Sequence, residues 1–301
     1  MTTAIELRSV SRVFGASTAL DDVSITVPEG SICGLLGRNG AGKTTIMSII
    51  AGQDRPNSGS VEVFGRRPFE NEAVLADVSF VRDNQRYPDG YRLRHVLRIA
   101  PVFLPNWSDE IADELATGLR IPTDVDIKKF SRGQLSAVAI VLGLASRAPV
   151  TLLDEPYLGL DVTARSLFHD VLLRDFAAHP RTVLLSTHLI EESEALLDRV
   201  IIVDRGRVWF EGDTEQAGQV AFTLSGQADA VGRLAEGRPL LRSHTVGGLA
   251  SLTVRGTADE VVRTEARRVG AQLAPTTLHD LVAAIGDSEP EPVALTKGSG
   301  R

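Results

Sequence analysis

Hydrophobic runs of strand length alternate with helical patterns along the chain, from its start to about residue 212. Four of these runs, at residues 31–36, 78–81, 151–153 and 183–186, are entirely or mainly aliphatic, which is typical of strands covered on both faces. A helical stretch, residues 43–51, follows the first run after a glycine-rich turn. This alternation predicts an α/β layer built on a mostly parallel sheet.

A long helical block separates the second aliphatic run from the third. It extends from about residue 92 to 147 and contains acids at residues 109–110, which suit the positive end of a helix dipole. Apolar residues follow at helical spacing, at Ile111, Leu115 and Leu119. We therefore expect a helical subdomain, over about residues 84–147, inserted into the α/β layer.

The pattern changes after residue 212. Residues 221–224 and 250–254 are strand-like, and residues 257–260 (Thr-Ala-Asp-Glu) have the form of a capping box that opens a helix. The apolar positions of that predicted helix are Val261, Val262, Ala266 and Val269. This second pattern indicates a small α+β domain without a catalytic motif.

The length of 301 residues is sufficient for two domains that each bury a core. We expect a first domain over residues 1–215, a small accessory domain over 216–286 and a tail over 287–301. The tail is rich in Pro, Glu, Gly and Ser, so we predict that it is disordered.

Charge, cysteine content and hydropathy narrow the class of protein. The 32 basic and 39 acidic residues give a net charge of −7, so no chain-wide positive field favours nucleic acid. The single thiol, Cys33, cannot form an intrachain disulfide, and we expect an intracellular setting. The longest apolar run, 137–145, is far shorter than the roughly 20 residues that cross a bilayer, so we expect no transmembrane segment.

The segment Gly37–Thr44 carries the strongest chemical signal. Its sequence, GRNGAGKT, fits the pattern G-x-x-x-x-G-K-[ST] and lies between a predicted strand and a predicted helix. Glycines let successive backbone N–H groups face bound phosphates, Lys43 reaches the β and γ oxygens, and the Thr44 hydroxyl holds Mg²⁺. The alternative is a chance glycine-rich loop, but the strand-loop-helix context favours a P-loop nucleotide site.

Two acids and a histidine end two of the aliphatic runs. Asp154 and Glu155 follow residues 150–153, and His188 follows residues 183–187. Ligands bind α/β sheets at the carboxyl edge of the strands, so we expect Asp154 to meet Mg²⁺, Glu155 to orient or deprotonate the attacking water, and His188 to contact the γ-phosphate. The alternatives are solvated strand-end acids and a surface histidine.

Residues 130–134 (Phe-Ser-Arg-Gly-Gln) precede a helical run that leads to the acidic strand. A serine and a glycine at a helix N-terminus can form a second anion site. Taken alone, the segment is better explained as a plain N-cap in which Ser131 accepts hydrogen bonds from first-turn amides.

The order of these motifs resembles the ATP-binding subunit of an ABC transporter. The P-loop, the serine-glycine signature, the Asp-Glu strand, residues 159–161 (Gly-Leu-Asp) and residues 186–188 (Ser-Thr-His) occur in that family's order, over about residues 4–212. The resemblance implies a P-loop NTPase fold of the ABC ATPase type, and a dimer in which each protomer's signature meets the ATP held by its mate. It implies ATP contacts for Phe14, Gly37, Arg38, Asn39, Gly40, Ala41, Gly42, Lys43, Thr44, Thr45, Ser131, Gly133 and Asp161, with Phe14 stacked on adenine unless it is a core residue.

Three positions depart from the family pattern. Asp83 stands where the family usually has the Gln that senses Mg²⁺; it could be a metal ligand, or Gln85 could replace it. In the signature, Arg132 stands where Gly is usual and Phe130 where Leu is usual. The strength of the contact with the partner's nucleotide is therefore expected to differ.

The sequence predicts a bacterial ATPase subunit that binds ATP and Mg²⁺, dimerises around two ATP molecules and drives a separately encoded permease. Export is expected, because the residues after 216 resemble C-terminal extensions that are common in exporter subunits. For the role of this extension, a dimerisation or stability module is the better explanation, and a ligand sensor is the alternative. The expected location is the cytoplasmic face of the membrane, through the permease. The alternatives are a soluble ABC-type ATPase acting on ribosomes or nucleic acid, and a P-loop small-molecule kinase. A single P-loop and the negative charge disfavour the first, and the signature and His188 disfavour the second.

Overall fold

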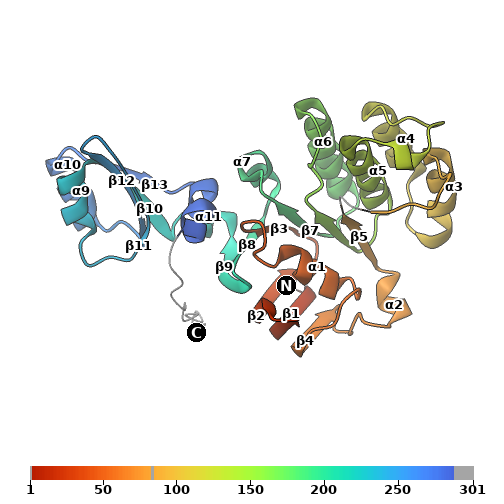
Figure 1. The fold of residues 1–301 in the computed structure, drawn as a ribbon, viewed down its shortest axis with the longest axis horizontal. Helices are drawn as coiled ribbons and strands as arrows, with labels where there is room; N and C mark the ends of the chain where they lie inside the picture. The colour runs from red at the N-terminus through yellow and green to blue at the C-terminus, as the bar shows by residue number, and fades with distance from the viewer. Residues whose placement is uncertain (1, 83–84, 288–301) are drawn as a thin grey trace. The chain divides into compact units, whose positions relative to one another are not determined.

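The structure is a computed structural model that describes residues 2–82 and 85–287. The chain forms two compact units, Met1–Glu211 and Gly212–Arg301 (Figure 1). The predicted tail from residue 288 onward lies outside the described residues. Across the described residues, no helix combines the length and the apolar character that spanning a membrane requires.

A six-stranded sheet forms the centre of the first unit, in the order β5-β6-β7-β3-β8-β9. The pairs β5–β6, β6–β7, β7–β3 and β3–β8 are all parallel, so the predicted mostly parallel core sheet is confirmed. The loops after β3, β6 and β7 therefore meet at one edge, the carboxyl edge of these strands. The strands are β3 (Ile32–Leu36), β5 (Val78–Arg82), β6 (Val150–Asp154), β7 (Thr182–Thr187), β8 (Arg199–Asp204) and β9 (Arg207–Asp213).

A second, antiparallel sheet of the first unit comes mainly from the N-terminus, in the order β2-β1-β4. Its strands are β1 (Thr3–Phe14), β2 (Ser17–Pro28) and β4 (Ser58–Val63). The expected alternation of strand and helix from the very start is wrong here, because β1 and β2 pair antiparallel through a short turn at Gly15. Each strand buries only part of its residues, as strands of a sheet with one covered face do.

The helices of the first unit include the block predicted between β5 and β6. Ser108 caps α4 by accepting a hydrogen bond from the Ile111 N–H. The helix ends at Gly118, one residue short of Leu119, the last apolar position of the predicted spacing. Residues of α1 and of both sheets share one hydrophobic cluster, which fixes the start of α1 at the carboxyl edge. The helices are α1 (Lys43–Ile50), α2 (Glu72–Leu75), α3 (Leu93–Phe103), α4 (Asp109–Gly118), η1 (Ile127–Lys129), α5 (Arg132–Ala145), α6 (Val162–Ala178), α7 (Ile190–Ser193) and η2 (Glu194–Leu196).

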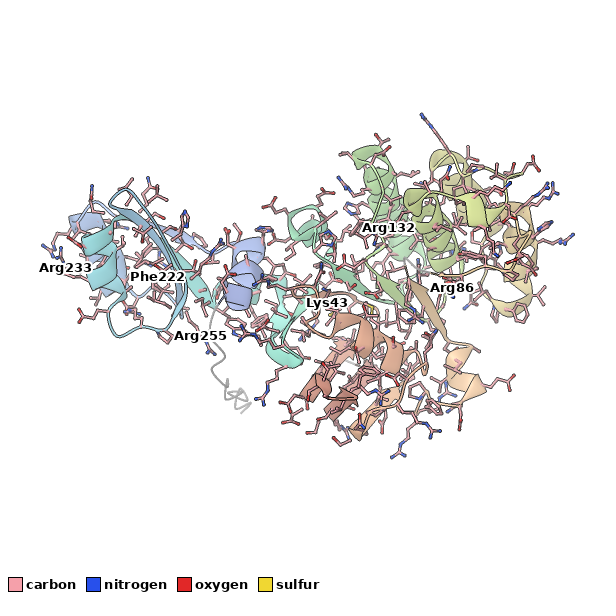
Figure 2. The ribbon with its side chains drawn as sticks, in the orientation of Figure 1. Lys43, Arg86, Arg132, Phe222, Arg233 and Arg255 are labelled. Atoms are coloured by element: carbon pink, nitrogen blue, oxygen red, sulfur yellow. The ribbon has the colours of Figure 1, made fainter. Side chains whose placement is uncertain are left out.

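The second unit contains a four-stranded sheet in the order β11-β12-β10-β13, with every neighbouring pair antiparallel. The element order β10-α9-β11-β12-α10-β13 with this strand order is the ferredoxin-like arrangement of two interleaved βαβ units. Phe222 of β10, labelled in Figure 2, belongs to the small core that the sheet shares with α9 and α10. The elements are α8 (Thr214–Ala217), β10 (Ala221–Gln227), α9 (Ala228–Ala235), β11 (Leu240–Val246), β12 (Leu249–Arg255), α10 (Glu260–Arg268), β13 (Gln272–Pro275) and α11 (Leu278–Asp287).

The capping box predicted at residues 257–260 is wrong in register. Asp259 is the N-cap of α10, and its carboxylate accepts a hydrogen bond from the Val262 N–H at 2.8 Å. The helix therefore begins two residues later than predicted. This shift leaves Val262 and Ala266 in the core and Val261 exposed.

Candidate functional site

The glycine-rich loop joins β3 to α1 at the carboxyl edge. Gly37 and Gly42 have φ angles of 150° and 111°, a region that favours glycine. A Cβ would lie 2.1 Å from the Val203 carbonyl oxygen at Gly37, and 2.7 Å from Leu20 Cδ2 at Gly42. The loop conformation thus requires glycine at both positions, and it leads into the first turn of α1, whose amides lack helical acceptors.

Lys43 is buried at the start of α1 (Figure 2), with only 6% of its surface exposed. Its Nζ donates hydrogen bonds to the carbonyl oxygens of Gly37 at 2.8 Å and Arg38 at 3.3 Å. The carboxylate oxygen Oε1 of Glu155 lies 3.6 Å from the same nitrogen. The ammonium is therefore held between the loop and the end of β6, where it can meet phosphate oxygens.

Thr44 and Asp154 meet through their side chains. The Thr44 hydroxyl donates to Asp154 Oδ2 at 2.7 Å, and the buried Ser186 hydroxyl donates to Asp154 Oδ1 at 2.6 Å. Hydroxyl and carboxylate oxygens are ligands that Mg²⁺ accepts, usually together with waters and substrate phosphates. The pair fits a Mg²⁺ site that is completed by the nucleotide.

No cluster of three or more His, Cys, Asp or Glu suited to a metal occurs in the described part of the chain. The third metal ligand suggested by the sequence, Asp83, lies outside the described residues. Gln85, considered as its replacement, is exposed.

Glu155 and His188 form the second close pair. His188 donates to Glu155 Oε2 from its ring Nδ1 at 2.6 Å and from its backbone N–H at 3.3 Å. Glu155 adopts a φ of 50°, and its N–H bonds the carbonyl and hydroxyl oxygens of Ser186 at 3.2 and 3.0 Å. Its other oxygen, Oε1, is buried, has no hydrogen-bond partner among the described residues and faces the Lys43 ammonium at 3.6 Å.

Ser186 is a site residue to which the sequence reasoning gave no role. It is fully buried and fixes both Asp154 and the backbone of Glu155. The feature that reveals its role is the pairing of the two strands, in which Ser186 of β7 lies opposite Asp154 of β6. That pairing follows from the strand order, which a single sequence does not contain.

The signature residues have local structural roles at the surface of the first unit. Ser131 caps α5 in a reciprocal box with Gln134, and Asp161 caps α6 through the Ala164 N–H at 2.8 Å. Gly133 lies so close to the turn before α6 that a Cβ would be 2.2 Å from the Gly159 carbonyl oxygen. The structure joins Lys43, Thr44, Asp154, Glu155 and His188 directly, whereas the hydrogen bonds of Ser131 and Asp161 named here close their own helix ends.

Phe14 is not a core residue, because 48% of its surface is exposed. The Arg12 guanidinium lies over its ring, 4.2 Å from the centroid, and forms an ion pair with Asp54 at 2.7 Å. The ring is thus anchored at the end of β1 and remains accessible for stacking.

This fold and loop define a P-loop α/β nucleotide-binding domain, and comparisons with known proteins identify its family. The family profile described as "ABC transporter" matches residues 20–158. The chain is 31% identical over 216 residues to an uncharacterized ABC transporter ATP-binding protein of Methanocaldococcus jannaschii, covering 70% of this chain and 78% of that one. The chain belongs to the ABC transporter ATP-binding family, whose cassettes are ATPases that use ATP with Mg²⁺, so the resemblance proposed from the sequence is confirmed.

Other relatives differ in the direction of transport that their names state. An aliphatic sulfonates import ATP-binding protein of Burkholderia lata is 33% identical over 205 residues, covering 68% of this chain. A Nod factor export ATP-binding protein of Sinorhizobium fredii is 31% identical over 216 residues, covering 69%. The chain spans only 62% of the length of each of these two relatives.

Solved structures show the same fold. The ATP-binding subunit of an ABC transporter aligns with a TM-score of 0.64 at 26% identity, covering 71% of this chain and 91% of that one. A dimeric ATP-binding cassette in a post-hydrolysis state, bound to ADP and Pi, aligns with a TM-score of 0.60 at 22% identity, covering 69% and 98%. The predicted fold class is therefore confirmed for the cassette.

Proposed function

We propose that this chain hydrolyses ATP as a dimer and thereby drives a membrane permease supplied by another polypeptide. The observation that carries the proposal is the convergence of Lys43, the Thr44–Asp154 pair and the Glu155–His188 pair at one sheet edge. Together they provide a phosphate clamp, a magnesium site and a candidate base within reach of one another.

In this proposal Lys43 and the amides at the start of α1 bind the β- and γ-phosphates of ATP. Mg²⁺, held by Thr44 and Asp154, would neutralise phosphate charge. Glu155 accepts the proton of the attacking water through Oε1, the oxygen that lacks a hydrogen bond among the described residues. His188 keeps Glu155 in place through Oε2 and presents the other side of its ring to the γ-phosphate.

Dimerisation would bring the signature of one protomer to the ATP of the other. Ser131 is exposed at the N-terminus of α5, beside the N-terminus of α6 that Asp161 caps, and the positive end of the α5 dipole attracts anions. The contact Gly133–Gly159 keeps these two termini together. A surface of this kind suits the phosphates of a nucleotide held by a second copy.

The permease and the direction of transport are the finer parts of the proposal. Val102 and Phe103 at the end of α3 are 77% and 73% exposed, which suits contact with a membrane subunit. We propose export, on the resemblance of the second unit to extensions of exporter subunits, and a location at the cytoplasmic face of the membrane. The soluble ATPase and the kinase remain less favoured alternatives.

The test is ATP hydrolysis and dimerisation of the purified full chain. We expect phosphate release from Mg·ATP without any acceptor, and an ATP-dependent dimer that Glu155→Gln traps on size-exclusion chromatography. Turnover that needs a phosphoryl acceptor would favour the kinase instead. For the permease, affinity purification from membranes solubilised in detergent should yield one polytopic membrane protein, and recovery of ribosomes or nucleic acid would contradict the proposal.

A further inference from the structure

A cluster of three polar side chains, two of them buried and one partly exposed, lies just beyond the catalytic pair. Tyr157, two residues after Glu155, is 2% exposed. Its hydroxyl lies 3.0 Å from His169 Nε2 on α6 and 3.2 Å from Ser193 Oγ on α7. Ser193 is fully buried, and its hydroxyl lies 2.9 Å from the carbonyl oxygen of Leu189. The cluster thus links the segment that follows Glu155 to the residue that follows His188.

The hydrogen positions in this cluster follow from the donors available. A carbonyl oxygen accepts only, so the single hydroxyl hydrogen of Ser193 is used on Leu189. We assign the Tyr157 hydrogen to Ser193 Oγ and the Nε2–H tautomer to His169, which then donates to the Tyr157 oxygen. In this arrangement all three contacts are hydrogen bonds, and they run in one direction from α6 to Leu189.

The strands themselves hold the two catalytic segments together only up to their ends. The register of β6 and β7 places Asp154 opposite Ser186, and Ser186 also binds the Glu155 N–H. Past this point the chains turn away into separate helices. The Tyr157–Ser193–Leu189 hydrogen bonds form a second connection, on the far side of the Glu155–His188 contact.

We infer that Tyr157 and Ser193 are positioning residues that hold His188 against Glu155 during ATP hydrolysis. The inference rests on the proposed function, because it assigns these residues to the same catalytic site. Neither touches the reacting atoms. They act by fixing the Leu189 carbonyl, and with it the neighbouring His188, relative to the turn that begins at Glu155.

The hydroxyl of Tyr157 can be separated from the packing of its ring. The ring makes edge contacts with Phe168 and His169, each with 5.3 Å between centroids, and a phenylalanine would keep them. Burial raises the pKa of Tyr157 above its usual range, so the phenol keeps its proton and remains a donor. Tyr157→Phe therefore removes the proposed connection while it leaves the core filled.

The experiment compares steady-state hydrolysis of Mg·ATP by the wild type, Tyr157→Phe and Ser193→Ala. We expect kcat to fall roughly 5- to 100-fold in each variant, the range between one lost hydrogen bond and a misplaced catalytic group, with KM for ATP unchanged. The matched control is Tyr87→Phe, since the Tyr87 hydroxyl is buried without a partner among the described residues, and this variant should keep the wild-type kcat.

A double-mutant cycle with His188→Ala distinguishes an effect of Tyr157 on the position of His188 from general damage to the structure. Radiolabelled ATP under single-turnover conditions measures the slow rate of that variant. If Tyr157 acts through His188, adding Tyr157→Phe to His188→Ala should cause no further loss. An unchanged kcat in Tyr157→Phe, or an equal loss in both backgrounds, would overturn the inference. Absence of acceptor-free hydrolysis by the wild type would instead refute the proposed function.

Discussion

The two edges of the core sheet both bury charged groups, but they arrange them differently. At the amino edge, Asp175 of α6 accepts hydrogen bonds from Arg147 at 2.6 Å and from Arg181 at 2.8 Å. At the carboxyl edge, the Lys43 ammonium lies 3.6 Å from Glu155, whose Oε1 has no hydrogen bond among the described residues. Direct charge pairing at the first edge supports folding, whereas the second leaves charged atoms available to a ligand.

The largest expected difference between the two edges is in ATP turnover, and Glu155→Gln at the carboxyl edge tests it. The amide keeps the size of the side chain but cannot take a proton from water, so ATP turnover should fall roughly 100- to 10,000-fold, the usual contribution of a general base. Because the glutamine amide oxygen can still accept the hydrogen bond from His188, and the Lys43 ammonium lies as far as 3.6 Å from Oε1, the free energy of unfolding should stay near that of the wild type. Phosphate release and chemical denaturation measure the two quantities, and unchanged turnover would remove Glu155 from the mechanism.

The opposite result is expected for Asp175→Asn. Loss of the carboxylate leaves two neighbouring guanidinium groups, one of them on the buried Arg181, without their counter-ion. Breaking a buried pair costs about 3–5 kcal/mol, so the free energy of unfolding should fall by that amount. Hydrolysis per folded molecule should be retained.

Asp170→Asn is the matched control for this prediction, because Asp170 lies on the same helix and is exposed. It should leave the unfolding midpoint in urea nearly unchanged. If Asp175→Asn instead lost turnover while keeping its stability, the amino edge would have a functional role and the contrast between the edges would fail.

The sequence predicted the carboxyl edge far better than the amino edge, for a physical reason. The P-loop is local in sequence, and strand-end acids are placed by the alternation of strands and helices alone. Arg147, Asp175 and Arg181 are scattered charges whose meeting depends on how α6 packs, which no spacing reveals. The role of Ser186 was missed for the same reason, since it depends on the order of β6 and β7.

Local signals also failed where two choices were chemically similar. Both Thr257 and Asp259 can cap a helix, and the structure uses Asp259, which also binds Arg238 at 2.9 Å. The residue used as the cap, Asp259, is thus the one that also contacts Arg238, which is distant in sequence. The antiparallel pairing of β1 and β2 was not predicted, because the hydrophobic pattern of a strand does not reveal which strand it pairs with.

A smaller effect is expected at Phe14, which belongs to neither edge. If its exposed ring stacks on adenine, Phe14→Ala should weaken ATP binding by about 1–3 kcal/mol and leave the free energy of unfolding nearly unchanged. Fluorescent ATP titration measures the affinity. Phe103→Ala, a second exposed phenylalanine, is the control and should bind as the wild type does. Equal affinities in both variants would remove Phe14 from the nucleotide site.

The smallest effect is expected at the carboxyl edge, where His169 should influence the pH dependence of stability without influencing turnover. Burial lowers the pKa of His169, so the folded chain holds it neutral while the unfolded chain takes a proton near pH 6.5. Its stabilising contribution is therefore present above that pH and is lost as the pH falls through the folded-state pKa. In His169→Gln, whose amide can still donate to Tyr157, melting between pH 7.5 and 5.5 should depend less steeply on pH, at wild-type kcat. An acid dependence as steep as that of the wild type would show that the imidazole does not change protonation on unfolding, and a lost kcat would place His169 with Tyr157 in the positioning of His188.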